Sequence, residues 1–438
     1  MITSGITTHS GGPRPPLQSP DYAPSFRMGS HAYPRCVPSR PPEAVAPPPG
    51  NPRFPLLDPL RAVAALCIVA THTAGLSGFN SKHALGAWTA RLDCGVAIFF
   101  VLSAFLLYRP FVAARLEGRP RPGVLRYARR RALRILPAYW LALVVQALVW
   151  PQYVKGVFDG GGWVYFTLLQ SWSAHTILGG LGVAWSLSVE VAFYVLLPVY
   201  AFTAAKLCGG DAHRELQLLA ALFVLAVLAR IVVHALDPTS VYLSTLPGNW
   251  AWFAAGLALA VTSARGERPG YVRWVGEHAL LCWGIAFGLL TVAAWAVGLP
   301  RTLTGQYGSF ALQAQHVIYI GVAVCLVAPI VLAEGRRSLP ASLLSTRVLA
   351  WLGLVSYGIF LWHQPLVVQF LHVDFWFPVA GYPPYTLVVA VVATAIAAVS
   401  YYGLERPILR LKEPQRAGGT GGARASTRAR AVAAKSES

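Results

Sequence analysis

Three ionisable side chains lie on one face of the first long apolar stretch, residues 57–72. Arg61 and His72 are eleven positions apart, and at 3.6 residues per turn both point to one side of a helix, about 16 Å apart along its axis. Asp58 lies on the same face, one turn before Arg61. A neutral His72 imidazole could take a proton from a hydroxyl, and the Arg61 guanidinium could hold a phosphate or a polarised carbonyl.

A row of ionisable groups is unusual inside an apolar helix. Such groups are costly in a bilayer, so these three together indicate a functional site. The alternative is structural: Arg61 only pairs with Asp58, and His72 only hydrogen-bonds to another helix.

A second candidate site is the basic segment Tyr127–Tyr139, which contains Arg131 and Arg134. These two arginines are three positions apart and are neighbours on a helix, at the predicted cytoplasmic mouth of the protein. A cluster of guanidinium groups there suits a phosphorylated cytosolic ligand. The alternative is that the charges only set the topology, as positive residues on the inner side of a membrane protein do.

A carboxylate, Glu190, lies about one and a half turns inside a later apolar stretch, at a depth comparable with that of His72. Ser186, Glu190 and Tyr194 share one helix face at positions i, i+4 and i+8. Glu190 could orient His72, stabilise its charged form or bind an acceptor molecule. The alternative is a structural partner for Arg61, Arg230 or another buried donor.

A second histidine, His363, lies midway along the ninth apolar stretch, two residues before Pro365, which loosens the helix. A histidine in this setting is typical of a hydrogen bond between helices, and we assign His363 a supporting role.

The composition indicates an all-α, polytopic membrane protein. Of the 438 residues, 55% are hydrophobic and 12% are charged, whereas a soluble domain has about 25% charged residues. Several apolar runs reach 18 residues or more, and the short alternating segments of a β-barrel are absent from the sequence. The net charge of +19 lies between the apolar runs and at the termini, which argues against nucleic acid as a partner.

Ten apolar segments are predicted to cross the membrane. They are residues 57–77, 93–112, 135–151, 185–205, 216–236, 249–263, 279–299, 312–333, 349–370 and 386–404. A further apolar segment, 161–178, is too short to span and is predicted to lie at the interface or to re-enter.

The distribution of positive charge predicts that both termini are cytoplasmic. With the N-terminus inside, the inner segments hold 29 of the 36 Lys and Arg residues and the outer loops hold 4. On this topology, residues 1–55 form a disordered, Pro-rich cytoplasmic tail, 56–411 a membrane domain, and 412–438 a disordered, basic cytoplasmic tail. No cleavable signal peptide is expected. The six cysteines have no metal-ligand spacing, so we predict no metal and no disulfide.

The motifs resemble, in order, those of the acyltransferase-3 family of integral membrane acyltransferases. The first is Leu57-Asp-Pro-Leu-Arg61 followed by His72, which is similar to that family's Arg, ten residues, His hallmark. Pro59 and Ala104 stand where the family often has Gly, and Pro is well tolerated in the first turn of a helix. The resemblance covers roughly residues 55–411, and the chain is expected to lack the esterase-like domain that some members carry. The other matching segments are 95–107, 130–139, 185–190, 356–365 and 405–407.

The resemblance implies an O-acyltransferase of the cell (plasma or inner) membrane. It would move an acyl group, with acetyl the expected one, from cytosolic acyl-CoA to a hydroxyl of a carbohydrate, glycolipid or secondary metabolite. His72 would be the base and Arg61 its partner in the donor channel, Arg131 and Arg134 would match the basic motif, and Glu190 the family carboxylate. Acyl-CoA would be a co-substrate, with no tightly bound cofactor.

Three alternatives remain open at the level of the sequence. Transfer could be direct or could pass through a covalent acyl-His intermediate. The protein could instead be a transporter or flippase for a glycolipid or acylated metabolite, although the sequence contains no internal repeat of the kind that transporters often have. A membrane scaffold or sensor is the third alternative, against which the buried Arg61, His72 and Glu190 argue.

Overall fold

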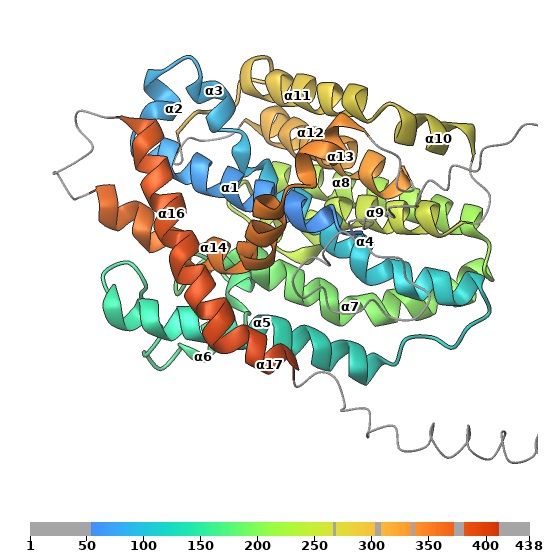
Figure 1. The fold of residues 1–438 in the computed structure, drawn as a ribbon, viewed down its shortest axis with the longest axis horizontal. Helices are drawn as coiled ribbons and strands as arrows, with labels where there is room; N and C mark the ends of the chain where they lie inside the picture. The colour runs from blue at the N-terminus through green and yellow to red at the C-terminus, as the bar shows by residue number, and fades with distance from the viewer. Residues whose placement is uncertain (1–53, 266–268, 303–307, 334–337, 372–380, 411–438) are drawn as a thin grey trace, which may run out of the picture. The chain divides into compact units, whose positions relative to one another are not determined.

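The computed structural model describes residues 54–265, 269–302, 308–333, 338–371 and 381–410 (Figure 1). All of them belong to one compact unit of the chain, Ala46–Ser438. The two predicted tails, 1–55 and 412–438, lie outside the described residues apart from Phe54 and Pro55.

Every regular element in the described ranges is helical, which confirms the all-α class. Each of the ten predicted apolar segments lies largely in a helix. These helices are α1 (Leu57–Leu76), α4 (Gly95–Leu116), α5 (Val124–Val149), α7 (Ala184–Cys208), α8 (Ala212–Leu236), α9 (Leu246–Ala264), α11 (Ala279–Trp295), α12 (Ser309–Leu332), α14 (Arg347–Leu371) and α16 (Tyr382–Ser400). Shorter helices join them: α2 (Phe79–Lys82), α3 (Gly86–Thr89), α6 (Trp163–Phe166), α10 (Gly270–Glu277), α13 (Leu339–Leu344) and α17 (Arg406–Arg410).

The prediction of about ten spans compares with eight or nine candidate spans in the part of the chain that the structure describes. Within the described residues, eight helical stretches are long and apolar enough to cross a membrane, or nine if α10 and α11, which meet at 82°, cross as one. The predicted span 249–263 corresponds to α9, which is not among them. The first turn of α9 contains the polar Asn249. The side-chain amide of Asn249 donates hydrogen bonds to the backbone carbonyls of Leu243 and Thr245. Much of α9 is buried against other helices, so its surface does not need the hydropathy of a lipid-facing span.

The segment 161–178 contains two short helical pieces, α6 and the 3-10 turn Gln170–Trp172, and no spanning helix, as predicted. It packs against α5, because the Tyr139 hydroxyl donates to the Tyr165 carbonyl at 2.7 Å and the Trp140 indole to the Phe166 carbonyl at 2.9 Å. It meets α7 through a 2.7 Å hydrogen bond between the hydroxyls of Ser171 and Ser188.

Helix α1 packs against α4, α14 and α16, and small residues bring its backbone close to two of these neighbours. At Gly353 of α14, an added Cβ would overlap the Asp58 carbonyl. At Gly95 of α4, it would overlap the Ala64 carbonyl. Close approach at small residues is the usual way in which membrane helices pack. These contacts fix the position of the helix that carries Asp58, Arg61 and His72.

Two prolines beside the site each remove one hydrogen bond from their own helix. The backbone carbonyl that loses its partner accepts instead from a side chain of another helix. Pro365 has no N–H for the Leu361 carbonyl, which accepts instead from the buried Gln146 amide of α5 at 3.0 Å. Pro198 likewise frees the Tyr194 carbonyl, which accepts from the Tyr127 hydroxyl at 3.1 Å. These bonds connect α5 to α14 and to α7 within the protein interior.

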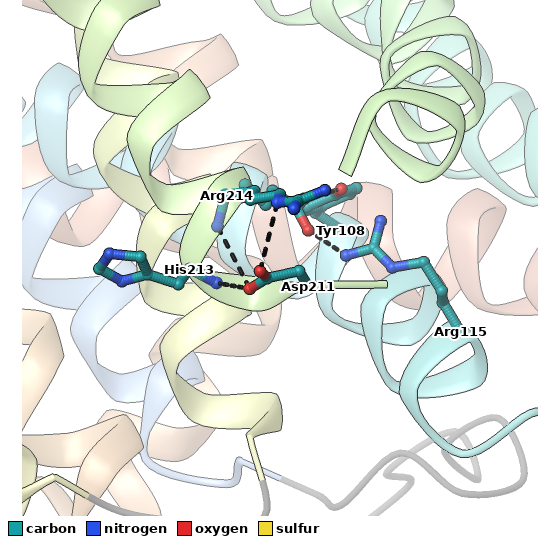
Figure 2. A network of polar contacts seen from close by, with 6 residues as sticks. Tyr108, Arg115, Asp211, His213 and Arg214 are labelled. Carbon is teal, nitrogen blue, oxygen red and sulfur yellow. Dashed lines mark hydrogen bonds and ion pairs between the residues drawn. The ribbon is translucent and has the colours of Figure 1, made fainter. Parts of the chain in front are cut away.

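At the other end of α4, a buried carboxylate joins that helix to α8. Glu215 accepts from the Tyr108 hydroxyl and forms an ion pair with Arg115. Asp211 caps α8 by accepting from two backbone N–H groups, those of His213 and Arg214 (Figure 2), and these bonds lower the pKa of its carboxyl. The network orders the connection between α7 and α8.

Candidate active site

A cavity lies between α1, α4, α5, α7 and α14. Its walls combine apolar side chains with ionisable groups that the sequence singled out. The polar lining is Arg61, Ser103, Arg131, Arg134, Ser186, Glu190, Tyr194, Ser356 and Tyr357, and the apolar lining is Ile68, Val96, Phe99, Phe100, Ile135, Leu187 and Phe360.

Arg61 of α1 forms an ion pair and also lines the cavity. Its guanidinium lies 2.8 Å from the Asp58 carboxylate, so the predicted ion pair within the helix exists. The Asp58 side chain is 51% exposed and does not line the cavity, whereas the Arg61 side chain is 14% exposed and does. Pairing with Asp58 therefore leaves Arg61 directed at the cavity.

Arg131 and Arg134 of α5 reach the same cavity as Arg61, so three guanidinium groups meet there. The Nε atom of Arg131 is buried and has no hydrogen-bond partner among the described residues. Like charges that share one cavity repel one another, and a buried donor without a partner, here Nε of Arg131, is costly. An anionic ligand with several oxygen acceptors would relieve both penalties.

Glu190 of α7 supplies the acidic group of the cavity lining. Its Oε1 atom accepts hydrogen bonds from the Ser103 hydroxyl of α4 and from the Tyr194 hydroxyl one turn along α7. These bonds hold the carboxylate in the cavity wall, and no described contact joins Glu190 to His72. The sequence missed Ser103, whose signal was a lone hydroxyl inside the apolar run 95–107.

His72 and His363 meet one helical turn beyond the end of the cavity. The cavity reaches Ile68 of α1 and Phe360 of α14, four and three residues before the two histidines. Their rings are parallel within 5°, with centroids 5.1 Å apart, and His72 Nδ1 lies 2.9 Å from His363 Nε2. His363 is fully buried and His72 is partly buried. The predicted hydrogen bond of His72 to another helix is therefore observed, and its partner is His363.

The structure thus divides the predicted residues into two adjoining groups. Arg61, Arg131, Arg134 and Glu190, with Ser186 and Tyr194, surround the cavity. His72 and His363 form a pair just beyond it, and Asp58 supports Arg61 from the outside. Ser356 and Tyr357, to which the sequence assigned no role, complete the wall from α14. The arrangement offers a cationic chamber for an anion and a pair of imidazoles at its end.

The chain is similar to known proteins over most of its membrane part. The model of a family described as "Acyltransferase domain" matches residues 55–402. The chain is 28% identical over 387 residues to YrhL of Bacillus subtilis, a proposed peptidoglycan O-acetyltransferase, covering 81% of this chain and 55% of that protein. It is 24% identical to the peptidoglycan O-acetyltransferase OatA of Listeria monocytogenes, covering 72% of this chain and 49% of the relative.

The O-acetyltransferase OatA of Staphylococcus aureus is also 24% identical, over 82% of this chain and 58% of the relative. The chain thus spans about half the length of the curated relatives it matches. No solved structure matches the chain.

Proposed function

The chain belongs to the acyltransferase-3 family, and on this basis we propose that it transfers an acetyl group from cytosolic acetyl-CoA to a hydroxyl of a cell-envelope glycan. The observation that carries the proposal is the meeting of three arginines in one cavity that ends one turn short of two paired histidines.

The donor would bind through its phosphates. Arg131 and Arg134 of α5, with Arg61 of α1, would face the phosphate oxygens of coenzyme A, because guanidinium groups bind phosphate with charge-assisted, often bidentate hydrogen bonds. The pantetheine arm would then run along α1 past Ile68, and the thioester would lie near His72. The apolar lining of the cavity suits this uncharged arm.

The transfer would follow from His72 acting as a general base. His72 takes the proton of the acceptor hydroxyl while the oxygen attacks the thioester carbonyl carbon. The C–S bond breaks, the ester forms, and the coenzyme A thiolate leaves and takes up a proton. Glu190 would hold the hydroxyl groups of Ser103 and Tyr194 in place in the cavity wall, because both donate hydrogen bonds to its carboxylate.

The relatives support a glycan as the acceptor, because two of them are named for peptidoglycan and the third as an O-acetyltransferase. We therefore propose a sugar hydroxyl as the acceptor, approaching from the outer face of the membrane. Glycolipids and secondary metabolites are the other hydroxyl-bearing classes to be tested.

The experiment compares purified wild-type protein in detergent with His72→Ala and His213→Ala. The readout is free coenzyme A thiol released from acetyl-CoA in the presence of glycan fragments. His213 is exposed at the start of α8, so His213→Ala is a matched control that leaves the site intact. We expect His72→Ala to lower the rate by about 10²-fold or more and His213→Ala to leave it unchanged.

A transporter or flippase would consume no thioester in detergent. Wild-type protein that releases no coenzyme A thiol with any of the three acceptor classes would contradict the proposed function, as would a His72→Ala variant with near wild-type rate. Mass spectrometry of envelope glycans, lipids and metabolites from cells with and without the protein would identify the acceptor by the loss of one acyl mass.

A further inference from the structure

The two histidines lie on a path of hydrogen bonds that begins at a backbone carbonyl. The Nδ1 atom of His363 is 2.7 Å from the carbonyl oxygen of Phe360, one turn earlier in α14. The Nε2 atom of His363 is 2.9 Å from Nδ1 of His72. The sequence places these residues 291 positions apart, and the packing of α1 against α14 brings them together.

The carbonyl of Phe360 determines which ring nitrogen carries hydrogen in each of the two histidines. A carbonyl oxygen can only accept, so Nδ1 of His363 carries the hydrogen. A neutral imidazole has one N–H, so Nε2 of His363 is an acceptor. Nδ1 of His72 must then be the donor of the 2.9 Å bond, and the remaining atom, Nε2 of His72, carries a lone pair.

We propose that His363 is a positioning residue that holds His72 in its Nδ1–H tautomer, with Nε2 as the base. This inference rests on the proposed function. The other tautomer would carry hydrogen on Nε2 of His72, and that atom would have no lone pair with which to take a proton from a hydroxyl. His363 has the role toward His72 that a carbonyl or carboxylate has toward many histidines in other enzymes.

The histidine pair can also stabilise the imidazolium form of His72 that arises during transfer. When Nε2 of His72 takes the acceptor proton, His72 becomes an imidazolium and keeps its Nδ1–H bond to the neutral His363. His363 keeps its own hydrogen on Nδ1 and goes on accepting through Nε2, so the imidazolium of His72 stays hydrogen-bonded. The proton then leaves through Nε2 to the coenzyme A thiolate, which restores the starting tautomer.

Two amide substitutions separate positioning from mere packing. In His363→Gln the side-chain amide reaches the position of the imidazole Nε2, so its oxygen can accept from His72. In His363→Asn the amide reaches only the position of Nδ1, so it can keep the bond to the Phe360 carbonyl but not the bond to His72. We expect kcat to fall by about 10²-fold or more in His363→Asn and by about tenfold or less in His363→Gln.

The KM for acetyl-CoA should stay near its wild-type value in both variants, because neither touches the arginine cavity. Thermal unfolding of both proteins checks that they are folded. Equal losses of kcat in two folded variants would overturn the proposal, and so would a His363→Asn variant with wild-type kcat.

A measurement on the unaltered chain does not depend on the folding of any variant. Wild-type protein labelled with ¹⁵N-histidine reports the tautomer of each ring by NMR, and the His72 signals are those absent from the spectrum of a labelled His72→Gln sample. We expect hydrogen on Nδ1 and a lone pair on Nε2 of His72, and the opposite tautomer would overturn the proposal. If the tautomer is as expected but wild-type protein releases no coenzyme A thiol, the proposed function fails, and the positioning role fails with it.

Discussion

At the scale of single residues, Arg61 lies between an acidic neighbour and basic neighbours. Asp58 pairs with it on its own helix, and the arginines of α5 share the cavity with it. The ion pair holds Arg61 in place without cancelling the positive charge of the chamber, because the cavity is lined by three guanidiniums and by the carboxylate of Glu190. The chamber is therefore suited to an anion, and coenzyme A is an anion.

Arg131 provides the sharpest single-residue test, since its buried Nε has no described partner. Arg131→Gln should raise the KM for acetyl-CoA by about 10- to 100-fold, the equivalent of one lost charge-assisted hydrogen bond, with a smaller change in kcat. Steady-state kinetics with varied acetyl-CoA measures both. Arg130→Gln is the control, because Arg130 is exposed on the same helix and does not line the cavity. Equal KM values in the two variants would remove Arg131 from the donor site.

At the scale of the helices, the site is positioned by close helix packing at a glycine and by a proline that removes a hydrogen bond within α14. Gly353 lets α14 lie directly on the start of α1, and Pro365 loosens α14 just after His363. The Leu361 carbonyl freed by Pro365 is satisfied from α5 by Gln146. Helix α14 is thus held by α1 at Gly353 and by α5 at Leu361, two residues before His363.

Two glycine substitutions test this packing with opposite expected signs. Gly353→Ala should lower the thermal midpoint of unfolding and the transferase rate, because the added Cβ overlaps the Asp58 carbonyl and must push α1 away. Gly284→Ala in α11 should be neutral or stabilising, because nothing lies within 4 Å of its Cβ position and Ala favours a helix over Gly by about 1 kcal/mol. Thermal unfolding in detergent compares the two variants, and equal midpoints would show that the contact at Gly353 is unimportant.

At the scale of the whole molecule, the direction of the site depends on the topology. The bias of positive charge predicts the α1–α4 connection outside and the α4–α5 connection inside. The arginine cavity would then be reached from the cytosol, where acetyl-CoA is made, and the histidine pair would lie toward the outer half. The side of the membrane on which each terminus lies remains a prediction.

Cysteine labelling of intact cells tests this direction. Lys82 and Glu117 are both exposed, one in each connection. A maleimide that cannot cross membranes should label Lys82→Cys in intact cells and Glu117→Cys only after the cells are opened, with the unaltered chain as the background control. The reverse pattern would place the arginines at the outer face and exclude a cytosolic donor for this site.

The sequence by itself determined the class of the protein, the helices and the residues worth examining. Apolar length and the period of 3.6 residues are local properties, so the ten helices were predictable from neighbouring residues. Arg61, Arg131, Arg134 and Glu190 were visible because charge inside or beside an apolar run is costly, and the structure places all four around one cavity. Helical spacing also placed Ser186 and Tyr194 correctly on the face of Glu190.

Only the tertiary structure decided which of these residues meet. Helical periodicity gives the face and the depth of a side chain but not the neighbouring helix, so depth alone paired Glu190 with His72. In the structure Glu190 bonds to Ser103 and Tyr194, and His72 bonds to His363. The surroundings of α9 were likewise not readable from the sequence: α9 is an apolar run, but how far it faces helices rather than lipid depends on packing between segments far apart in the chain.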